Sequence, residues 1–257
     1  MEGKDMRLEN KVAIVTGGSQ GIGEAIAQRF ASEGASVAIV YSRNDEAANS
    51  AVNKIAAAGG KAIAVKGNCA DVADIKRFVA AIAERLGGVD ILINNAGTFK
   101  TVPVSETTEE IWDAQIDLNL KGTFFCTQAV LPYFRKRGGG KVVNITSIAG
   151  VAAFPNCPAY CASKGGVAIL TRALATELAA ENINVNAIGP GNVATPINEH
   201  LRGPGHEDYI KLMSENTPTG RAFMDVGDMT GAAVFLSSDD AKGVHGAVLM
   251  VDDGWSA

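Results

Sequence analysis

The chain has 257 residues, of which 47% are hydrophobic and 20% charged, and its formal net charge is −5. This acidic balance gives no reason to expect nucleic acid or an anionic membrane as a partner. No apolar run approaches the length of a membrane span, and the polar start MEGKDMRLENK lacks the apolar core of a signal peptide. The four cysteines follow no metal-ligand spacing, so we expect no metal site and a reduced, cytoplasmic setting.

The first 41 residues have the order of a dinucleotide-binding unit. Residues 11–16 form a short apolar run, which is typical of a strand buried on both faces. The turn TGGSQGIG (residues 16–23) follows, then a helical pattern to Glu33 and a second apolar strand over residues 35–41. Glycines in such a turn let the backbone approach a pyrophosphate at the helix N-terminus. The spacing G-x-x-x-G-x-G is looser than the usual pattern, so the flanking strand and helix are needed to support the prediction.

The alternation of strands and helices continues to the C-terminus. Further strands are predicted over residues 61–66, 89–93, 141–145, 183–188 and 246–251. Further helices are predicted over residues 45–58, 72–86, 108–136, 158–180 and 225–237. Seven strands alternating with six helices predict an α/β fold with a Rossmann-type, doubly wound parallel sheet. No linker divides the chain, so residues 1–257 are predicted to form a single domain, with an irregular polar insertion over residues 193–217.

Three side chains suited to chemistry lie close together in residues 144–166. They are Ser147, Tyr160 and Lys164, and the last two share one face of a predicted helix because they are four residues apart. Two unit charges about 4 Å apart attract by roughly 4 kcal/mol at an effective dielectric of about 20. That attraction would lower the pKa of the tyrosine from about 10 toward 7. Such a tyrosine could exchange protons at neutral pH.

Other informative residues follow the ends of different strands. The glycine turn follows the first strand, residues 94–97 the fourth, Ser147 the fifth and residues 189–195 the sixth. In a doubly wound sheet the ligands bind outside the carboxyl ends of the strands. The fold therefore predicts that these segments meet at one edge of the sheet.

On these residues the chain resembles the short-chain dehydrogenases/reductases, from about residue 7 to residue 254. The matching pieces are TGGSQGIG, Asp71-Val72, NNAG (residues 94–97), Asn119, Ser147, the Tyr160/Lys164 pair and PGNVAT (residues 190–195). A lone Y-x-x-x-K is a weak signal, whereas seven pieces in this order are specific. The resemblance implies an oxidoreductase that transfers a hydride between a nicotinamide cofactor and a ketone or secondary alcohol.

The resemblance also implies roles for the residues. Tyr160 would be the general acid/base, Lys164 would lower its pKa and bind the nicotinamide ribose, and Ser147 would hold the substrate oxygen. Asn119 would position a water that links Lys164 to solvent. The implied cofactor-binding residues are Gly17, Ser19, Gln20, Gly21, Ile22, Gly23, Tyr41, Ser42, Arg43, Asp71, Val72, Asn95, Ala96, Gly97, Tyr160, Lys164, Pro190, Gly191, Val193 and Thr195.

The end of the second strand favours NADP(H) over NAD(H). Tyr41 stands where NAD-preferring dinucleotide folds place an acid for the ribose 2′-hydroxyl. Arg43 follows closely and could bind a 2′-phosphate, because its planar guanidinium suits phosphate recognition. The alternative is that Arg43 is only a solvated loop cation, and Asp45 and Glu46 would oppose a phosphate if they turned inward. NAD(H) therefore stays possible.

The substrate is less well defined by the sequence. We expect a pocket without a fixed charge for a carboxylate or phosphate, under a lid formed by the insertion, in which His200, Arg202 and His206 are solvated. The expected pocket residues are Phe99, Ser147, Val151, Ala152, Phe154, Tyr160 and Asn192.

The sequence is compatible with two classes of substrate. Residues 48–55, 59–67 and 188–198 resemble bacterial glucose and polyol dehydrogenases, which favours a polyol, sugar or small carbonyl substrate. The outline also resembles β-ketoacyl carrier-protein reductases, which need a basic surface for an acidic partner, and residues 135–137 (RKR) could supply part of it. A silent NADP-binding sensor or scaffold is the non-enzyme alternative. Family members usually form tetramers, so a homotetramer is expected.

Overall fold

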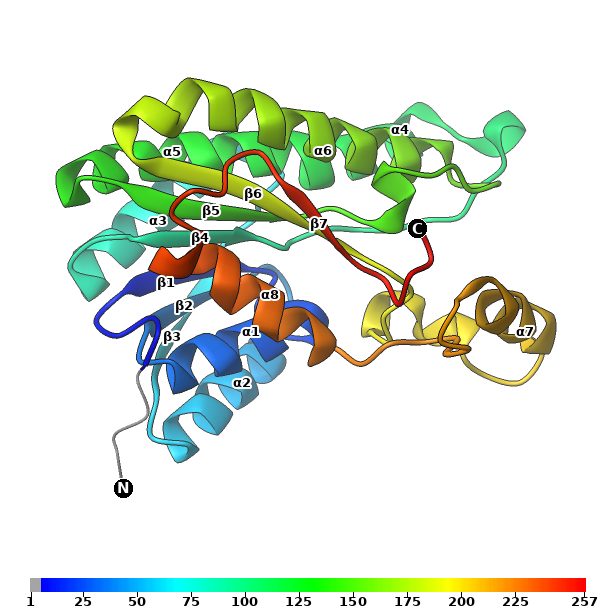
Figure 1. The fold of residues 1–257 in the computed structure, drawn as a ribbon, viewed down its shortest axis with the longest axis horizontal. Coiled ribbons are helices and arrows are strands. Elements are labelled where there is room, and N and C mark those ends of the chain that lie inside the picture. Colours follow the sequence, from blue (N-terminus) through cyan, green and yellow to red (C-terminus); the bar gives the residue numbers. More distant parts are fainter. Residues whose placement is uncertain (1–5) are drawn as a thin grey trace.

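The computed structural model describes residues 6–257. Its centre is one seven-stranded parallel sheet (Figure 1). The strand order is β3-β2-β1-β4-β5-β6-β7, with the crossover between β1 and β4. This arrangement confirms the predicted Rossmann-type fold. The strands are β1 (Val12–Thr16), β2 (Ser36–Tyr41), β3 (Lys61–Lys66), β4 (Ile91–Asn94), β5 (Gly140–Ile145), β6 (Ile183–Pro190) and β7 (Val248–Val251).

The central strands contribute alternate side chains to two hydrophobic cores. On β1, Ala13 and Val15 belong to one core and Ile14 belongs to the other. On β2, Val37 and Ile39 likewise face the first core, while Ala38 and Val40 face the second. Side chains alternate across a pleated strand, so a strand covered on both faces reads as a continuous apolar run.

Helices cover both faces of the sheet (Figure 1). The first core is closed by α1 (Gly21–Ser32), α2 (Asp45–Ala57) and α8 (Asp228–Ser237). The second core is closed by α3 (Val72–Leu86), α5 (Gly122–Arg137) and α6 (Pro158–Leu178), and α4 (Glu109–Ile116) packs along α6. None of the helices within residues 6–257 is both long and apolar enough to cross a membrane.

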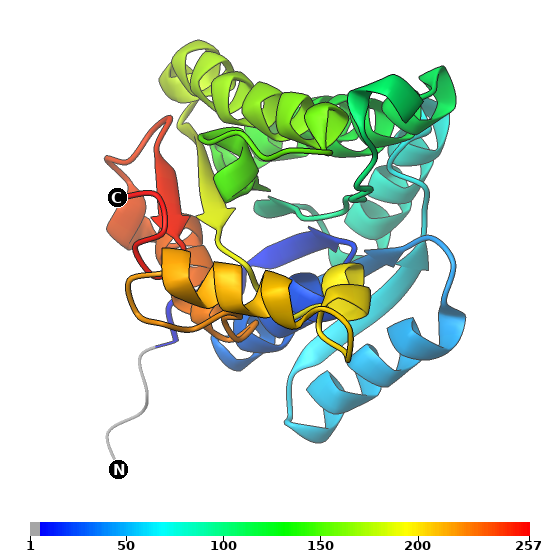
Figure 2. The ribbon, with the colours of Figure 1, turned by 90° about the vertical axis from the view of Figure 1, so that its right-hand side faces the viewer.

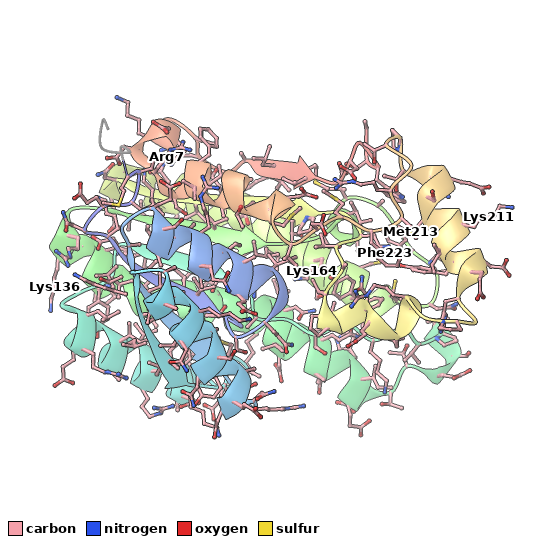
Figure 3. The ribbon with its side chains drawn as sticks, turned by 90° about the horizontal axis from the view of Figure 1, so that it is seen from below. Arg7, Lys136, Lys164, Lys211, Met213 and Phe223 are labelled. Carbon is pink, nitrogen blue, oxygen red and sulfur yellow. The ribbon has the colours of Figure 1, made fainter. Side chains whose placement is uncertain are left out.

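The structure corrects two sequence predictions. The helix expected over residues 108–136 contains a π-helical segment, Asp117–Lys121, which joins α4 to α5. The insertion at residues 193–217, hereafter the lid, is not irregular, because it contains a 3-10 segment, Pro196–Leu201, and helix α7 (Glu207–Asn216). Met213 of α7 is buried, whereas Lys211 on the same helix points outward (Figure 3). A helix this short with a single buried anchor gives a weak periodic signal.

Candidate active site

The glycine turn is packed too closely for larger residues. Gly17 has a φ of +63°, a conformation that glycine adopts without steric cost. A Cβ added to Gly23 would lie 2.4 Å from the Gly17 carbonyl oxygen and 2.5 Å from Asn95 Nδ2. The turn thus delivers the backbone to the N-terminus of α1, where N–H groups and the helix dipole attract an anion. These features fit a dinucleotide pyrophosphate.

Two short side chains fasten this turn to the end of β4. The buried Thr16 Oγ1 accepts hydrogen bonds from the backbone N–H groups of Asn95 and Ala96, both at 3.0 Å, and donates to the Ile93 carbonyl at 3.2 Å. Asn95 Nδ2 donates to the Thr16 and Gly17 carbonyls. Asn95, expected to bind the cofactor, and Thr16 thus both fix the position of the turn.

At the far end of the cofactor cradle, Asp45 is already paired with a lysine. Lys66 Nζ lies 2.9 Å from Asp45 Oδ1, and this hydrogen bond holds the pKa of Asp45 below its usual value. Arg43 is exposed, with no ion pair or hydrogen bond among residues 6–257. Asp71 Oδ1 caps α3 by accepting hydrogen bonds from the Ala73 and Asp74 N–H groups. The carboxylate of Asp71 that was expected to contact the cofactor is therefore already engaged in capping the helix.

The segment that follows β6 returns to the glycine turn. Pro190 and Gly191 lie at the end of the strand, and Val193 pairs with Met224 in an isolated β-bridge. A Cβ on Gly21 would lie 3.4 Å from Thr195 Cβ. Two segments about 170 residues apart in sequence therefore meet at the carboxyl edge of the sheet, which faces the viewer in Figure 2.

Three of the four expected catalytic side chains come from α6 and from the segment that follows β5. Ser147 follows β5, and its Oγ accepts from the Ala149 N–H at 3.1 Å. Lys164 is only 5% exposed, and its Nζ donates to the Ile145 carbonyl at 2.8 Å. The same Nζ lies 5.8 Å from the centre of the Tyr160 ring (Lys164 is labelled in Figure 3). Tyr160 and Lys164 share one face of α6, as their spacing predicts.

The pKa shifts differ from the sequence prediction. Loss of hydration raises the pKa of Tyr160 to about 12, although the residue as a whole is only partly buried, and a hydrogen bond with Ser147 acts in the opposite direction. Burial lowers the pKa of Lys164 to about 8. The predicted fall of the Tyr160 pKa toward 7 is therefore wrong. The four-residue spacing accounts only for the attraction between the two groups, whereas burial disfavours both charged forms and a backbone carbonyl binds the ammonium.

Asn119 lies at the π-helical segment and connects three parts of the site. Its Oδ1 accepts from the Thr98 N–H at 2.8 Å, and its Nδ2 donates to the Thr98 carbonyl and to Ser163 Oγ, both at 3.0 Å. A Cβ on Gly97 would lie 3.1 Å from Asn119 Oδ1 and 3.6 Å from Lys164 Nζ. Asn119 and Lys164 thus converge on the end of the NNAG segment. π-helical turns frequently mark functional sites.

Aromatic rings surround the tyrosine. Phe99 packs edge-on against Tyr160, with ring centres 4.8 Å apart. Phe154 stacks at 5.0 Å on Trp255, a residue that the sequence analysis did not place in the pocket. Val151 is 54% exposed and lies at the surface of the site.

The amide of Asn192 is bound within the chain. It donates from Nδ2 to the Ala222 carbonyl at 2.7 Å, and its Oδ1 accepts from Asn198 at 3.1 Å and from the Tyr209 hydroxyl at 3.5 Å. Asn192 therefore anchors the lid, a role that the sequence analysis did not foresee. Tyr209 of α7 was also missed, because the lid was read as irregular.

The fold and this constellation define a nucleotide-binding α/β oxidoreductase. The sequence model described as "short chain dehydrogenase" matches residues 11–204. The chain belongs to this family of enzymes, which act on alcohol and carbonyl groups. It is 37% identical to the 3-oxoacyl-(acyl-carrier-protein) reductase FabG of Staphylococcus epidermidis, over 95% of this chain and 98% of that one.

Two similar solved structures are also of dehydrogenases. A proposed 2-deoxy-D-gluconate 3-dehydrogenase of Agrobacterium tumefaciens, with bound NADP, is 42% identical with a TM-score of 0.88, over 98% of each chain. A proposed NAD(P)-dependent gluconate 5-dehydrogenase of Beutenbergia cavernae, with NADP bound at low occupancy, is 36% identical with a TM-score of 0.91, over 98% of this chain and 99% of that one.

Proposed function

We propose that the protein transfers a hydride between NADP(H) and a ketone or secondary alcohol, with Tyr160 as the general acid/base and a polyol, sugar or small carbonyl compound as substrate. The observation that carries this proposal is the convergence of Ser147, Tyr160, Lys164 and Asn119 beside the glycine turn. Tyr160 and Lys164 come from α6, Ser147 from the end of β5 and Asn119 from the π-helical segment, and the fold brings these three segments together.

The raised pKa of Tyr160 fits the role of proton donor in carbonyl reduction at neutral pH. A phenol with a pKa of about 12 stays protonated and can donate its proton to the oxygen of a carbonyl that is being reduced. Ser147 Oγ accepts from the Ala149 N–H and forms a hydrogen bond with Tyr160, so the serine and the phenol can bind the same substrate oxygen. The bound nicotinamide would supply the hydride. Phe99 packs against the tyrosine and limits access of water to the ring.

The choice of NADP(H) is supported by charge at the end of β2. Arg43 is exposed and free of carboxylates among residues 6–257, so it can meet a 2′-phosphate. Asp45, which would repel that phosphate, is neutralised by Lys66. NAD(H) stays the second cofactor, because the exposed Arg43 does not exclude a ribose that lacks the 2′-phosphate.

The preference for a sugar or polyol over an acyl carrier protein is supported at residues 135–137. Both oxygens of Glu181 accept from Arg135, at 2.5 and 2.8 Å, and Arg137 pairs with Asp90 at 3.6 Å. The basic triplet is therefore largely neutralised within the chain, which weakens it as a docking surface for an acidic partner. The similarity to FabG keeps β-ketoacyl carrier-protein reduction as the second candidate.

A homotetramer in the cytoplasm is part of the same proposal. Trp112 on α4 and Ile169 on α6 are 42% and 62% exposed, and β7 is an edge strand with Leu249 37% exposed. Exposed apolar side chains and an unpaired strand edge favour burial against further copies of the chain.

The test is a set of initial rates with the purified protein. NADPH and NADH are each combined with 5-ketogluconate, sorbose, simple ketones and an acetoacetyl thioester of the carrier protein. We expect the highest kcat/KM for NADPH with a sugar-like ketone. A kcat/KM for the thioester that equals or exceeds the best sugar-like value would transfer the proposal to the second candidate.

A further inference from the structure

Arg202 lies at the end of the 3-10 segment of the lid, and its environment differs from that of the other arginines. Among residues 6–257 the remaining arginines either form an ion pair or are exposed. Those paired with a carboxylate are Arg7, Arg29, Arg77, Arg135, Arg137 and Arg221. Those exposed are Arg43, Arg85 and Arg172. Arg202 alone is partly buried without an ion pair.

The contacts of Arg202 leave its guanidinium only partly satisfied. Its Nη2 donates to the Thr195 carbonyl at 3.1 Å, and its Nε is buried and has no partner among residues 6–257. A guanidinium carries five N–H donors and a fixed positive charge. Removing such a charge from water is costly unless an anion compensates it. Arg202 is therefore only partly solvated, with one side of its guanidinium turned into the protein.

The position of Arg202 indicates what could compensate it. Thr195, whose carbonyl holds the guanidinium, has its side chain against Gly21 at the N-terminus of α1. The Thr195 N–H is bound by Asn198 Oδ1, and Asn198 Nδ2 donates to Asn192. Arg202 is thus connected through short contacts both to the glycine turn and to the stem of the lid. Figure 2 shows the lid crossing the carboxyl edge of the sheet opposite α6.

We propose that Arg202 binds an anionic oxygen group of a ligand held between the lid and the glycine turn. This inference rests on the proposed function, because it concerns a ligand of the same site. Two sources of that group have the same chemistry: the pyrophosphate of the dinucleotide and the carboxylate of a sugar-acid substrate. In either case the ligand anion supplies the charge partner that the chain does not, and its binding holds the lid against the cofactor cradle.

The experiment compares Arg202→Gln, which keeps a donor for the Thr195 carbonyl but removes the charge, with Arg202→Lys, which keeps the charge. Arg172→Gln, at an exposed unpaired arginine, is the matched control. The dissociation constant of NADPH is measured by fluorescence titration without substrate. KM is then measured for 5-ketogluconate and for sorbose, which carries a hydroxymethyl group in place of the carboxylate. Thermal unfolding checks that each variant is folded.

A charge-assisted hydrogen bond predicts a loss of about 10- to 100-fold in the glutamine variant, with partial recovery in the lysine variant. A rise in the NADPH dissociation constant identifies the pyrophosphate as the partner. A rise in KM for 5-ketogluconate but not for sorbose identifies a carboxylate. If neither constant changes, or if Gln and Lys behave alike, the inference is overturned. The NADPH titration needs no turnover, so the effect of the variants on cofactor binding can be measured even if none of the proposed substrates is reduced.

Discussion

The two halves of the carboxyl edge are held together by different kinds of contact. At the glycine turn, Thr16 and Asn95 bind backbone groups directly, and Gly23 leaves no space for even one additional carbon. Around α6 and the lid, long side chains such as Lys164, Arg202 and Tyr209 make the contacts instead. In the first half, the backbone of the glycine turn is held in one position and forms the cofactor cradle. The second half is built from side chains, whose charges and protonation depend on burial.

Replacing the proposed proton donor should abolish most of the catalysis at the second half while leaving cofactor binding at the first half unchanged. Tyr160→Phe removes the hydroxyl and keeps the ring against Phe99. We expect kcat for ketone reduction to fall by about 10²- to 10⁴-fold, the usual contribution of general acid catalysis. The NADPH dissociation constant, measured by fluorescence, should change little. Reductase activity that survives in this variant would remove Tyr160 from the mechanism.

Filling the glycine turn should have the opposite effect. In Gly23→Ala the new methyl group would lie 2.4 Å from the Gly17 carbonyl, so the backbone of the cradle must move. Overpacking of this kind costs about 1–3 kcal/mol of folding stability. Because the displaced backbone belongs to the cofactor cradle, we expect a loss of similar size in binding, which is roughly 5- to 150-fold weaker binding of NADPH. Gly203→Ala in the lid is the control, because nothing lies within 4 Å of its added carbon. Equal NADPH affinity in both variants would contradict the tight-cradle interpretation.

A charge change at the far end of the cradle should separate the two nucleotides. In Arg43→Asp a phosphate ligand is replaced by a carboxylate, so kcat/KM for NADPH should fall by about 10- to 100-fold while the value for NADH changes much less. Lys242→Asp makes the same change in net charge at an exposed position near β7 and should affect neither. An equal loss of kcat/KM for NADPH and NADH in Arg43→Asp would contradict the NADP(H) assignment.

The sequence predicted the cradle better than the lid for a physical reason. Buried strands leave continuous apolar runs, and the parallel topology brings the ends of β1, β4, β5 and β6 to one edge, so the fold and the grouping of the site follow from local patterns. Helix α3 was predicted with the same bounds that the structure gives. The contact roles of Thr16 and Trp255 depend on residues far away in the chain, and no local pattern encodes them.

The same reason explains the errors in charge and protonation. A four-residue spacing places Tyr160 and Lys164 on one face of α6, but it gives no information on how much water surrounds them. Desolvation of the phenol outweighs its neighbours and raises the pKa. The half-burial of Arg202 depends likewise on the path of the lid, which closes on Thr195.

The pH dependence of reduction tests the central claim most directly, which is that Tyr160 acts as a protonated donor beside a charged Lys164. The pKa values of about 12 for Tyr160 and about 8 for Lys164 leave both groups protonated at neutral pH. We predict that kcat for NADPH-dependent ketone reduction is constant from about pH 6 to 7.5 and falls above pH 8, where Lys164 loses its proton. A rate that instead rises between pH 6 and 9 would show that the phenolate is the active form and would contradict the account.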